Sequence, residues 1–335
     1  MKNIFGNNYR KVFSRILVTG DKGFVGQYAL TGLLGAIGLS TLKPNIDIRD
    51  KKSVLECLRA FQPDAVLHLA ALSFVPDSFK EPETTFEVNF LGTLRLLEAL
   101  QETGFKGSFI YVGTGDAYGR VPAEELPIRE ERILRPLNPY AVSKAASEAL
   151  CFQWSQTGSF EIMMARPFNH IGPGQSPNFA ISDFARQIAE IAAGDCAPVL
   201  NVGNIDATRD FTDVADVVYA YELILAYGQN GEIYNVCCGI ERSVRTLLNQ
   251  LLNLSGITAE IVVDSVRYRP SDQPRVCGSY QKLMVHTGWQ PKTSIDESLL
   301  NLYRYWEAEL NESKKNCLDH GYNRTGRGLS GKAVA

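Results

Sequence analysis

The sequence predicts an α/β fold in which a doubly wound parallel sheet is combined with a smaller, interleaved α/β domain. Short apolar runs rich in β-branched residues alternate with amphipathic stretches through the first half of the 335 residues. Such alternation is typical of a parallel sheet with helices on both faces. A glycine triplet directly follows the first apolar run, at the point where a strand would turn into a helix. A later run, EIYNVCCG at 232–239, resembles the early ones, so we expect the chain to return to the first sheet.

The elements of the first half can be assigned in order along the chain. Buried strands are expected at RILVTG (15–20), AVLHLAA (65–71), SFIYVGTG (108–115) and EIMMARP (161–167), with a further strand ending at Leu39–Lys43. Helices are expected at 24–34, 88–102 and 139–156. The middle helix has the clearest pattern, because apolar residues recur every three positions from Val88 to Leu97.

The second half of the chain breaks this alternation. HIGPGQSPNF at 170–179 is rich in glycine and proline and is typical of a loop. We expect one domain to comprise residues 13–168 and 211–240, and a smaller one to comprise 169–210 and 241–312. Residues 1–12 and 313–335 show no apolar periodicity, and we expect both ends to be flexible.

The composition argues against several classes of protein. A formal net charge of −3 lacks the basic excess of nucleic-acid binders, so no nucleic-acid partner is expected. No apolar run is long enough to cross a bilayer, and residues 1–15 are not followed by the apolar core and cleavage site of a secretory signal. These features favour a cytoplasmic protein without a membrane partner. The seven cysteines show no CxxC spacing and the four histidines no ligand spacing, so neither a metal site nor a disulfide framework is expected.

A dinucleotide-binding turn is predicted at TGDKGFVG, which places Gly20, Gly23 and Gly26 at three-residue intervals. The turn from strand to helix is tight, and glycine lets the backbone approach a pyrophosphate at the helix N-terminus. The N–H groups there, around Phe24 and Val25, would bind the phosphates. The spacing differs by one residue from GxGxxG, and a plain strand–helix turn is the alternative. The position directly after RILVT favours the cofactor interpretation and a Rossmann domain.

The choice between NAD and NADP depends on the end of the second strand, where an acid binds the adenosine ribose in NAD enzymes. The segment Leu39–Lys43 contains no acid and ends on a lysine, whereas a carboxylate there would repel the 2′-phosphate of NADP. This favours NADP(H), with NAD(H) as the alternative. Asp47 and Ile48 follow in the next loop, where they are expected to meet the adenine end of the cofactor.

Tyr140 and Lys144 are the candidate reacting residues. They lie four positions apart near the start of a predicted helix and therefore share one face. A nearby ammonium lowers the pKa of a phenol, so the tyrosine could exchange a proton with a substrate oxygen. An exposed helical pair is the alternative. Two features argue against it: Asn138–Pro139 fixes the entry to the helix, and Thr114 at the preceding strand end can hydrogen bond to the same oxygen.

These segments together resemble the extended short-chain dehydrogenase/reductases that act on nucleotide sugars. The similarity rests on TGxxGFxG, HLAA at 68–71, Asn89 ahead of a Gly-Thr pair, the strand-end Thr114 and YAVSK at 140–144, in order over residues 15–310. The resemblance implies that Thr114 orients the reacting oxygen, that Tyr140 exchanges the proton, and that Lys144 binds the nicotinamide ribose. It further implies that the cofactor is contacted by Leu69, Ala70, Ala71 and Asn89.

Three later segments indicate the substrate class. ARPFNHIGPGQ (165–175) resembles the substrate loop of the GDP-sugar enzymes of this family, in which the residue matching Asn169 contacts the diphosphate. In ATRDFTDVAD (207–216), Arg209 matches the family's diphosphate clamp, and a guanidinium suits phosphate through paired hydrogen bonds. A surface ion pair of Arg209 with the following aspartate is the alternative. In RYRPSD (267–272), Arg269 and Asp272 match residues that contact the diphosphate and the nucleoside ribose.

The resemblance implies reduction of the 4-keto group of GDP-4-keto-6-deoxy-D-mannose by NAD(P)H, with GDP-D-rhamnose as the expected product and its talose epimer left open. A GDP-mannose 4,6-dehydratase is the first alternative, because dehydratases of the family carry a glutamate two residues after the catalytic threonine. Here Gly115 and Asp116 follow Thr114, and the shorter carboxylate, expected to face the substrate, favours simple reduction. Another nucleotide-sugar epimerase and a non-catalytic nucleotide-binding protein are the remaining alternatives. The resemblance also implies a homodimer, formed through the helices at 88–102 and 140–156.

Overall fold

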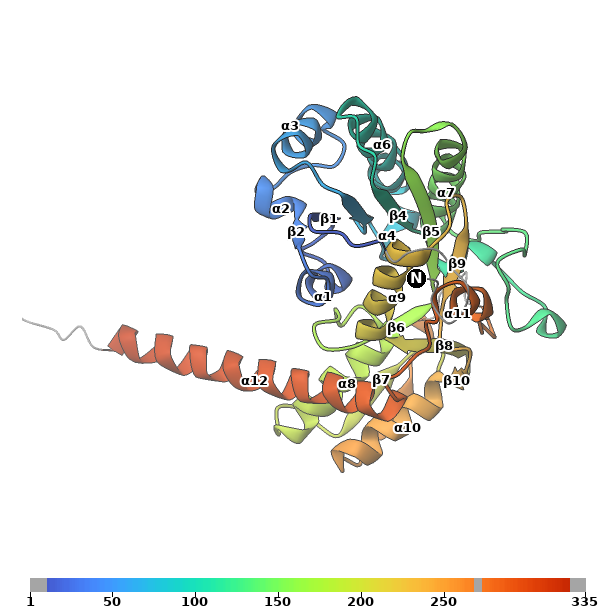
Figure 1. Cartoon of the computed structure of the whole chain (residues 1–335). Coiled ribbons are helices and arrows are strands. Elements are labelled where there is room, and N and C mark those ends of the chain that lie inside the picture. The colour runs from blue at the N-terminus through green and yellow to red at the C-terminus, as the bar shows by residue number, and fades with distance from the viewer. Residues whose placement is uncertain (1–10, 268–272, 326–335) are drawn as a thin grey trace, which may run out of the picture.

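The computed structural model describes residues 11–267 and 273–325, and for Ser265 and residues 316–325 it describes the backbone alone. Its larger part is built on a six-stranded parallel sheet in the order β2-β1-β3-β4-β5-β9 (Figure 1). The strands are β1 (Ile16–Thr19), β2 (Ala36–Gly38), β3 (Ala65–His68), β4 (Ser108–Val112), β5 (Glu161–Pro167) and β9 (Ile233–Val236). Every residue of β1, β3 and β4 is buried, as expected for strands that are covered on both faces.

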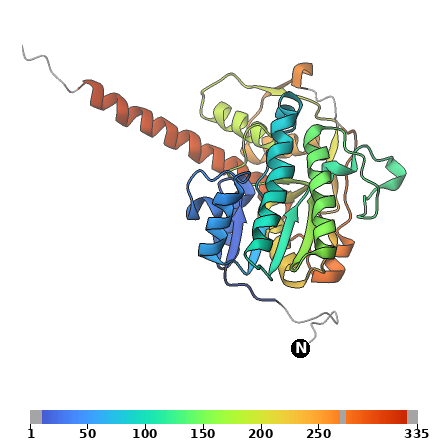
Figure 2. The same cartoon turned by 90° about the horizontal axis from the view of Figure 1, so that it is seen from above.

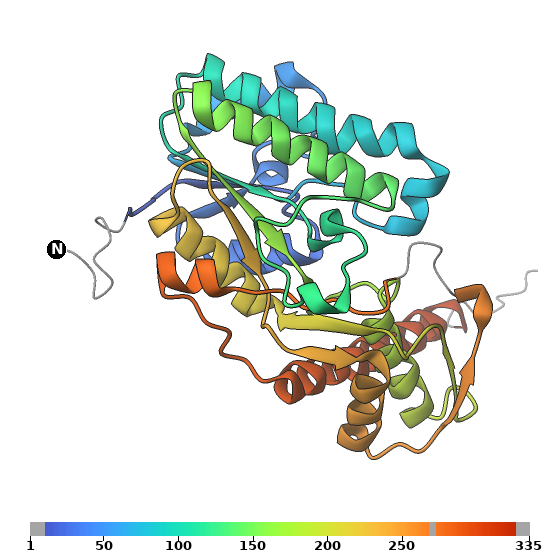
Figure 3. The same cartoon turned by 90° about the vertical axis from the view of Figure 1, so that its right-hand side faces the viewer.

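Helices cover both faces of this sheet, which confirms the predicted doubly wound α/β fold (Figures 2 and 3). α1 (Phe24–Gly32), α9 (Val214–Tyr227) and α11 (Gln281–Thr287) pack on one face, around a core that includes Val18 and Ile110. α3 (Lys51–Phe61), α6 (Gly92–Glu102) and α7 (Pro139–Thr157) pack on the other face, around Leu17 and Phe109. Neighbouring residues of one strand therefore belong to different cores, because successive side chains point to opposite faces of the sheet.

The carboxyl ends of the strands bring the predicted site segments to one edge of the sheet. The strand order reverses between β1 and β3, and such a switch point is where open α/β sheets bind their ligands. The loops after β1, β3, β4 and β5 all start from this edge. Short elements in the connections are α2 (Leu39–Leu42), α4 (Val75–Lys80), α5 (Pro82–Phe86), the π-helix η1 (Glu87–Leu91), and the 3-10 helices η2 (Gly115–Tyr118), η3 (Ala123–Glu125) and η4 (Ser265–Arg267).

A smaller domain lies at one end of this sheet (Figure 3). It holds a three-stranded sheet in the order β10-β8-β6 and a two-stranded pair of β11 with β7. Its elements are β6 (Asn169–Ile171), α8 (Ala180–Ala192), β7 (Val199–Val202), β8 (Thr208–Asp213), β10 (Glu241–Ser243), α10 (Val244–Ser255), β11 (Glu260–Val263) and α12 (Ile295–Thr325). Phe184, Leu247 and Leu302, one from each helix, pack in its core.

The two domains are interleaved, as the sequence predicted. β9 pairs with β5, so the chain returns to the first sheet after β8. It then returns a second time, because Leu283 and Trp289 lie in the core on the α9 side of the sheet. The indole Nε1 of Trp289 donates to the backbone oxygen of Asp216 at 3.0 Å. The segment assigned to the second domain, 241–312, therefore contains a stretch that packs with the first.

Two local expectations differ from the structure. The strand end expected at Leu39–Lys43 is wrong, because β2 ends at Gly38 and the following residues form α2. The helix expected at 88–102 is present, but it begins as the π-helical turn η1 and buries Leu96 and Leu100, whereas Leu91 is 40% exposed. The three-residue repeat thus found the helix but marked its buried face only in part, because Leu97 of the repeat is buried and Leu91 is not.

The chain ends also differ from expectation where the structure describes them. α12 continues to Thr325, past residue 312, and projects beyond the body of the molecule (Figure 1). Near the start, the backbone N–H of Lys11 donates to the carbonyl oxygen of Ala226 at 3.2 Å, and its ammonium pairs with Glu161. Residues 1–10 and 326–335 lie outside the described residues. No described helix has the length and apolar character needed to cross a membrane.

Candidate active site

The turn between β1 and α1 requires glycine at two of its three positions for reasons internal to the fold. Gly20 has a φ of +71°, and a Cβ there would lie 2.7 Å from the backbone nitrogen of Ala70. A Cβ on Gly26 would lie 2.3 Å from the carbonyl oxygen of Gly20. At Gly23 a Cβ would meet only that oxygen, at 3.2 Å, which is a mild contact. Gly23 lines the cavities on both sides of the turn, so its missing side chain leaves room for a ligand.

The start of α1 also has the chemistry of a phosphate site. Gly23 caps the helix without a side-chain hydrogen bond, and the first turn contains no acidic residue. Phe24 and Val25, the first helical residues, line the same cavity. The free N–H groups and the positive end of the helix dipole therefore suit the pyrophosphate of a dinucleotide.

A cavity of about 410 Å³ opens beside this turn and contains the predicted reacting residues. Its wall holds the following members of the predicted sets: Gly20, Gly23, Phe24, Val25, Gly26, Leu69, Ala71, Thr114, Asp116, Tyr140, Lys144 and Asn169. A second cavity, of about 450 Å³, shares Val75, Asn169, His170, Gln175 and Phe179 with the first. The two cavities therefore adjoin each other, and we call the first the reaction cavity and the second the outer cavity.

Thr114 and Tyr140 meet where β4 and α7 face the reaction cavity. Asn138 caps α7 by accepting from the Ala141 N–H at 2.7 Å, and Pro139 occupies the first turn. Tyr140 is therefore fixed at the start of the helix. It forms a hydrogen bond with Thr114, whereas the sequence led us to expect Thr114 to bond to the substrate oxygen.

The pKa of Tyr140 is shifted upward, which is opposite to the expectation from its spacing to Lys144. Burial of the phenol raises its pKa, the negative charge of Asp116 raises it further, and the hydrogen bond with Thr114 opposes both effects. The phenol therefore stays protonated at neutral pH in the free protein, and a protonated phenol is suited to donate to a substrate oxygen.

Lys144 carries its amine in the same buried environment. Burial lowers the pKa of Lys144 to about 8, and Cys151 and Glu148 act in the opposite direction. Its Nζ lies 4.7 Å from the centroid of the Tyr111 ring, within the range of a cation–π contact. The hydroxyl of Tyr111 donates to the backbone oxygen of Lys144 at 3.1 Å, which holds this turn of α7 against β4.

A buried ion pair ties together the segments that carry the reacting residues. The guanidinium of Arg166 on β5 donates to both carboxylate oxygens of Glu148 on α7, at 2.8 and 2.6 Å. Its Nη1 also donates to the hydroxyl of Tyr118 on η2, at 2.7 Å. Sequence reasoning missed this network, because Arg166 lies 18 residues from Glu148 and 48 from Tyr118, and no local pattern records contacts over such separations.

Asn89 and His68 lie behind the reaction cavity and hold the loop after β3. The amide of Asn89 accepts from the Leu72 N–H at 2.8 Å, and donates to the Leu72 oxygen at 3.1 Å and to Ser143 Oγ at 2.9 Å. His68 is hydrogen bonded to Thr19 at 2.7 Å, and burial lowers its pKa to about 3, so the ring stays neutral. The structure thus brings Asn89 to α7 and the β3 loop, whereas the resemblance implied a cofactor contact.

The adenosine end of the predicted cofactor site is a third cavity on the other side of the glycine turn. Gly20, Gly23, Asp47, Ile48 and Ala70 from the predicted set line it, together with Ser40 and Arg49. Arg49 forms paired hydrogen bonds with Asp47, which lower the pKa of that carboxyl. The ammonium of Lys43 instead donates to Ser53 Oγ at 2.8 Å and faces Glu56 at 3.4 Å. Lys43 therefore does not support the NADP preference in the way that its sequence position suggested.

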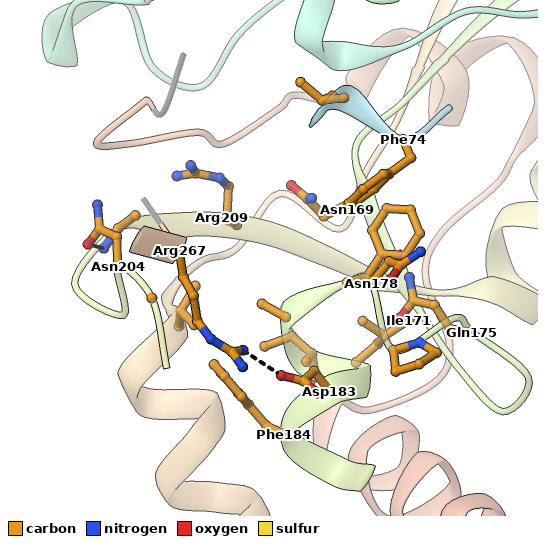
Figure 4. A pocket seen from close by; sticks show the side chains of 18 of the residues that line it. Phe74, Asn169, Ile171, Gln175, Asn178, Asp183, Phe184, Asn204, Arg209 and Arg267 are labelled. Carbon is orange, nitrogen blue, oxygen red and sulfur yellow. Dashed lines mark hydrogen bonds and ion pairs between the residues drawn. The ribbon is translucent and has the colours of Figure 1, made fainter. Parts of the chain in front are cut away.

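Two of the four predicted diphosphate and ribose contacts can be placed. Asn169 lines both cavities and Arg209 lines the outer one (Figure 4). Arg269 and Asp272 lie outside the described residues. Sequence reasoning assigned no role to the other residues of the outer cavity, which include Gln175, Asp183 and Arg267. Gln175 and Arg267 stand inside the motifs FNHIGPGQ and RYRPSD, so attention to whole motifs could have found them.

Comparison with known proteins agrees with this geometry. Residues 41–301 match the family described as GDP-mannose 4,6 dehydratase. The chain is 45% identical over 301 residues to the GDP-6-deoxy-D-mannose reductase of Pseudomonas aeruginosa, a match that covers 89% of this chain and 99% of that protein. Among solved structures, that of RMD from Pseudomonas aeruginosa complexed with NADPH is 43% identical with a TM-score of 0.83, over 88% of this chain and 99% of that one. The Thermus thermophilus UDP-glucose 4-epimerase complex with NAD is 32% identical with a TM-score of 0.76, over 87% and 98%. The chain therefore belongs to the GDP-mannose 4,6-dehydratase family, within the short-chain dehydrogenase/reductases that act on nucleotide sugars.

Proposed function

We propose that this protein reduces the 4-keto group of GDP-4-keto-6-deoxy-D-mannose with NADPH, giving a GDP-6-deoxyhexose, with GDP-D-rhamnose as the expected product. The proposal rests on Thr114, Tyr140 and Lys144 sharing one cavity in a chain that is 45% identical to GDP-6-deoxy-D-mannose reductase over 301 residues. NADPH is favoured because a related structure at 43% identity is complexed with it, and NAD(H) is the alternative because a related epimerase structure holds NAD.

The side chains of the reaction cavity have different roles in the proposed reduction. Bound NADPH supplies the hydride that the sugar C4 accepts. Tyr140 donates the proton to the C4 oxygen, since burial keeps its phenol protonated. Thr114 hydrogen bonds to the same oxygen and orients it. Lys144 binds the nicotinamide ribose, and its ammonium offsets the negative charge that develops on Tyr140 as the proton leaves.

The GDP part of the substrate extends into the outer cavity. Asn169 stands where the two cavities meet, and Arg209 lies farther along. The guanidinium of Arg209 suits the diphosphate, which carries its charge on oxygens that accept paired hydrogen bonds. Arg269 and Asp272 are assigned to the diphosphate and the nucleoside ribose on resemblance alone.

A GDP-mannose 4,6-dehydratase is the second candidate, because the family as a whole carries that description. Dehydration needs an extra acid/base that reaches C5 of the sugar. Asp116 lines the reaction cavity in the position where dehydratases of the family carry glutamate, but its carboxylate is one methylene shorter. This difference favours reduction without dehydration.

The test is a spectrophotometric assay on the purified full chain. NADPH absorbance is expected to fall steadily with GDP-4-keto-6-deoxy-D-mannose and to stay constant with GDP-mannose. Tyr140→Phe is the matched control, because it keeps the ring and removes the hydroxyl. We expect it to lower the rate by about 10²- to 10⁴-fold while NADPH binding stays nearly intact. Consumption of GDP-mannose in the presence of NADP⁺ would support the dehydratase instead, and unchanged turnover by Tyr140→Phe would contradict the role of that residue.

We also propose a homodimer and a cytoplasmic location. α6 and α7 lie side by side on one face of the sheet (Figure 2). Leu91, at the end of η1 just before α6, is 40% exposed, and Val142 and Phe152 on α7 are 38% and 49% exposed. These exposed apolar residues on η1 and α7 support pairing with a second copy. All six cysteines whose side chains the structure describes are free thiols, which supports a reducing compartment.

A further inference from the structure

The outer cavity ends in a pair of oppositely charged side chains. Asp183 comes from the first turn of α8 and Arg267 from η4, and their charged groups are in direct contact in the wall of the cavity (Figure 4). Neither residue lines the reaction cavity, whereas Asn169, Gln175 and Phe179 line both. If the sugar lies at Tyr140 and the diphosphate near Asn169 and Arg209, the nucleobase reaches the Asp183–Arg267 end. This step rests on the proposed function.

The carboxylate of Asp183 is held in one position. Its side chain is 11% exposed; Oδ1 accepts from Arg186 Nη2 at 2.7 Å, and Oδ2 accepts from Gln187 Nε2 at 2.8 Å. Gln187 is itself fixed, because its amide bonds to both backbone groups of Asn201 on β7. Oδ2 also accepts from Arg267 Nη1 at 2.9 Å. A carboxylate offers about four lone-pair sites, so one acceptor site remains after these three bonds.

Arg267 is less confined than Asp183. Its side chain is 44% exposed, and within the described part of the chain its guanidinium bonds to Asp183 alone. A guanidinium has five N–H donors, so the others remain to bind a ligand while the ion pair persists. A tether between η4 and α8 is the plain alternative, but an ion pair with one partner this exposed adds little stability.

The walls of the outer cavity suit a flat, apolar ring. Phe74 and Phe179 form an edge-to-face pair with centroids 6.2 Å apart, and Phe184 and Val244 line the same cavity. Ligand sites commonly combine such aromatic and aliphatic walls with a few placed polar groups. The ion pair supplies both a donor and an acceptor in a cavity whose walls are partly apolar and partly polar.

We propose that Asp183 and Arg267 select guanine over other bases in the nucleotide part of the substrate. The edge of guanine presents the O6 acceptor beside N–H donors on N1 and N2. Arg267 donates to O6, and the remaining acceptor site of Asp183 receives one of the N–H donors. Adenine reverses this order, with an amino donor facing Arg267 and a ring acceptor facing the carboxylate. Uracil offers a matching carbonyl and N–H, but its second carbonyl would face the carboxylate and its single ring fills less of the space.

The test compares nucleotide diphosphates on the full chain in the presence of NADP⁺. GDP and ADP are the main probes, because both bases are purines but present hydrogen-bond donors and acceptors in the opposite order. UDP is the third probe. Calorimetric titration of the wild type is expected to show GDP binding about 10- to 100-fold more tightly than ADP, since the bonds involve charged groups. In Asp183→Asn the GDP to ADP ratio is expected to fall to within about threefold of one, because an amide both donates and accepts and so matches adenine.

Two further variants complete the design. Glu190→Gln removes the other carboxylate partner of Arg186 without touching the cavity, and it is expected to keep the wild-type ratio. Arg267→Met tests the pair from its exposed side and is expected to lower the ratio as well, whether or not Asp183→Asn folds. An unchanged ratio in both cavity variants, or an equal loss of affinity for GDP and ADP, would overturn the proposal.

The outcome is separable from that of the proposed function. A wild type that oxidises NADPH with the 4-keto sugar but binds GDP and ADP equally contradicts base selection by this pair and leaves the reductase proposal standing. A wild type that prefers GDP through Asp183 but leaves NADPH unconsumed contradicts the reductase proposal alone.

Discussion

At the scale of single residues, burial of Lys144 favours its neutral amine, whereas its proposed role in the reaction requires the ammonium. Its pKa is lowered to about 8 from 10.5, chiefly because burial disfavours the ammonium. Between these two values the unfolded chain binds more protons than the folded one at this position. The free energy of unfolding therefore gains a contribution from Lys144 as the pH rises from about 8 to about 10.5, and this contribution is absent below pH 8.

Comparison with Lys144→Met isolates this effect, because other titrating groups contribute equally to both proteins. The stability of the wild type relative to Lys144→Met is expected to increase across this pH window by up to ~3 kcal/mol. Urea unfolding of the cofactor-free protein at a series of pH values measures the difference. A difference that stays flat, or one that decreases with pH, would show that the amine is not desolvated as the structure indicates.

The site residues separate what a sequence can predict from what it cannot. The spacing of Tyr140 and Lys144 within one helix, and the position of Thr114 at a strand end, are local features, and the structure brings all three to one cavity. The direction of the Tyr140 pKa shift is not local, because it depends on burial and on Asp116 from another segment. The side-chain path of Lys43 toward Ser53 likewise depends on packing between α2 and α3.

At the scale of elements, the turn between β1 and α1 contains glycines that are needed for two different reasons. Gly26 is needed because the fold leaves no room for a Cβ, and Gly23 because a ligand is expected beside it. Gly26→Ala places a Cβ against the carbonyl oxygen of Gly20 and is expected to destabilise the fold by about 1–3 kcal/mol. Gly23→Ala meets only a mild contact but fills space beside the helix N-terminus. It is expected to leave the melting temperature of the cofactor-free protein nearly unchanged and to weaken NADPH binding about tenfold or more, which corresponds to ~1.4 kcal/mol.

Thermal melts without cofactor and fluorescence titrations with NADPH measure both quantities on each variant. Gly26→Ala serves as the matched control, since any folded fraction retains the Gly23 position. Normal NADPH affinity in Gly23→Ala would show that the phosphates do not approach this backbone, and a large loss of stability would show that the contact is not mild.

The strands that were predicted well are those buried on both faces. β1, β3, β4 and β5 appear in sequence as continuous apolar runs, and the structure places them where expected. β2 was missed because it has only three residues, Ala36–Gly38, and no such run. The turn η1 was missed for a different reason: π-helical turns are rare, and apolar periodicity does not distinguish one from the α-helix that follows it.

At the scale of the whole molecule, the interleaved topology explains how distant segments form one site. β5 ends in the first domain and continues directly into β6 of the second, so Asn169 stands where the two cavities meet. Arg209 lies near the start of β8, and β8 leads directly into α9, which packs on the first sheet. The chain crosses between the domains several times, so segments far apart in the sequence can line two adjoining cavities.

The proposed homodimer is the last consequence of this architecture that can be tested. Phe152 is 49% exposed on α7, the helix that also carries the exposed Val142. In a symmetric dimer one substitution changes the interface twice, so Phe152→Glu is expected to introduce two buried charges and to dissociate the dimer. Leu254→Glu is the matched control, since Leu254 is 38% exposed on α10 in the other domain.

Sedimentation velocity over a range of protein concentrations measures the assembly state. We expect a dimer for the wild type and Leu254→Glu, and a monomer for Phe152→Glu. A monomeric wild type would remove the dimer proposal, and a Phe152→Glu dimer as tight as the wild type would place the interface on another face.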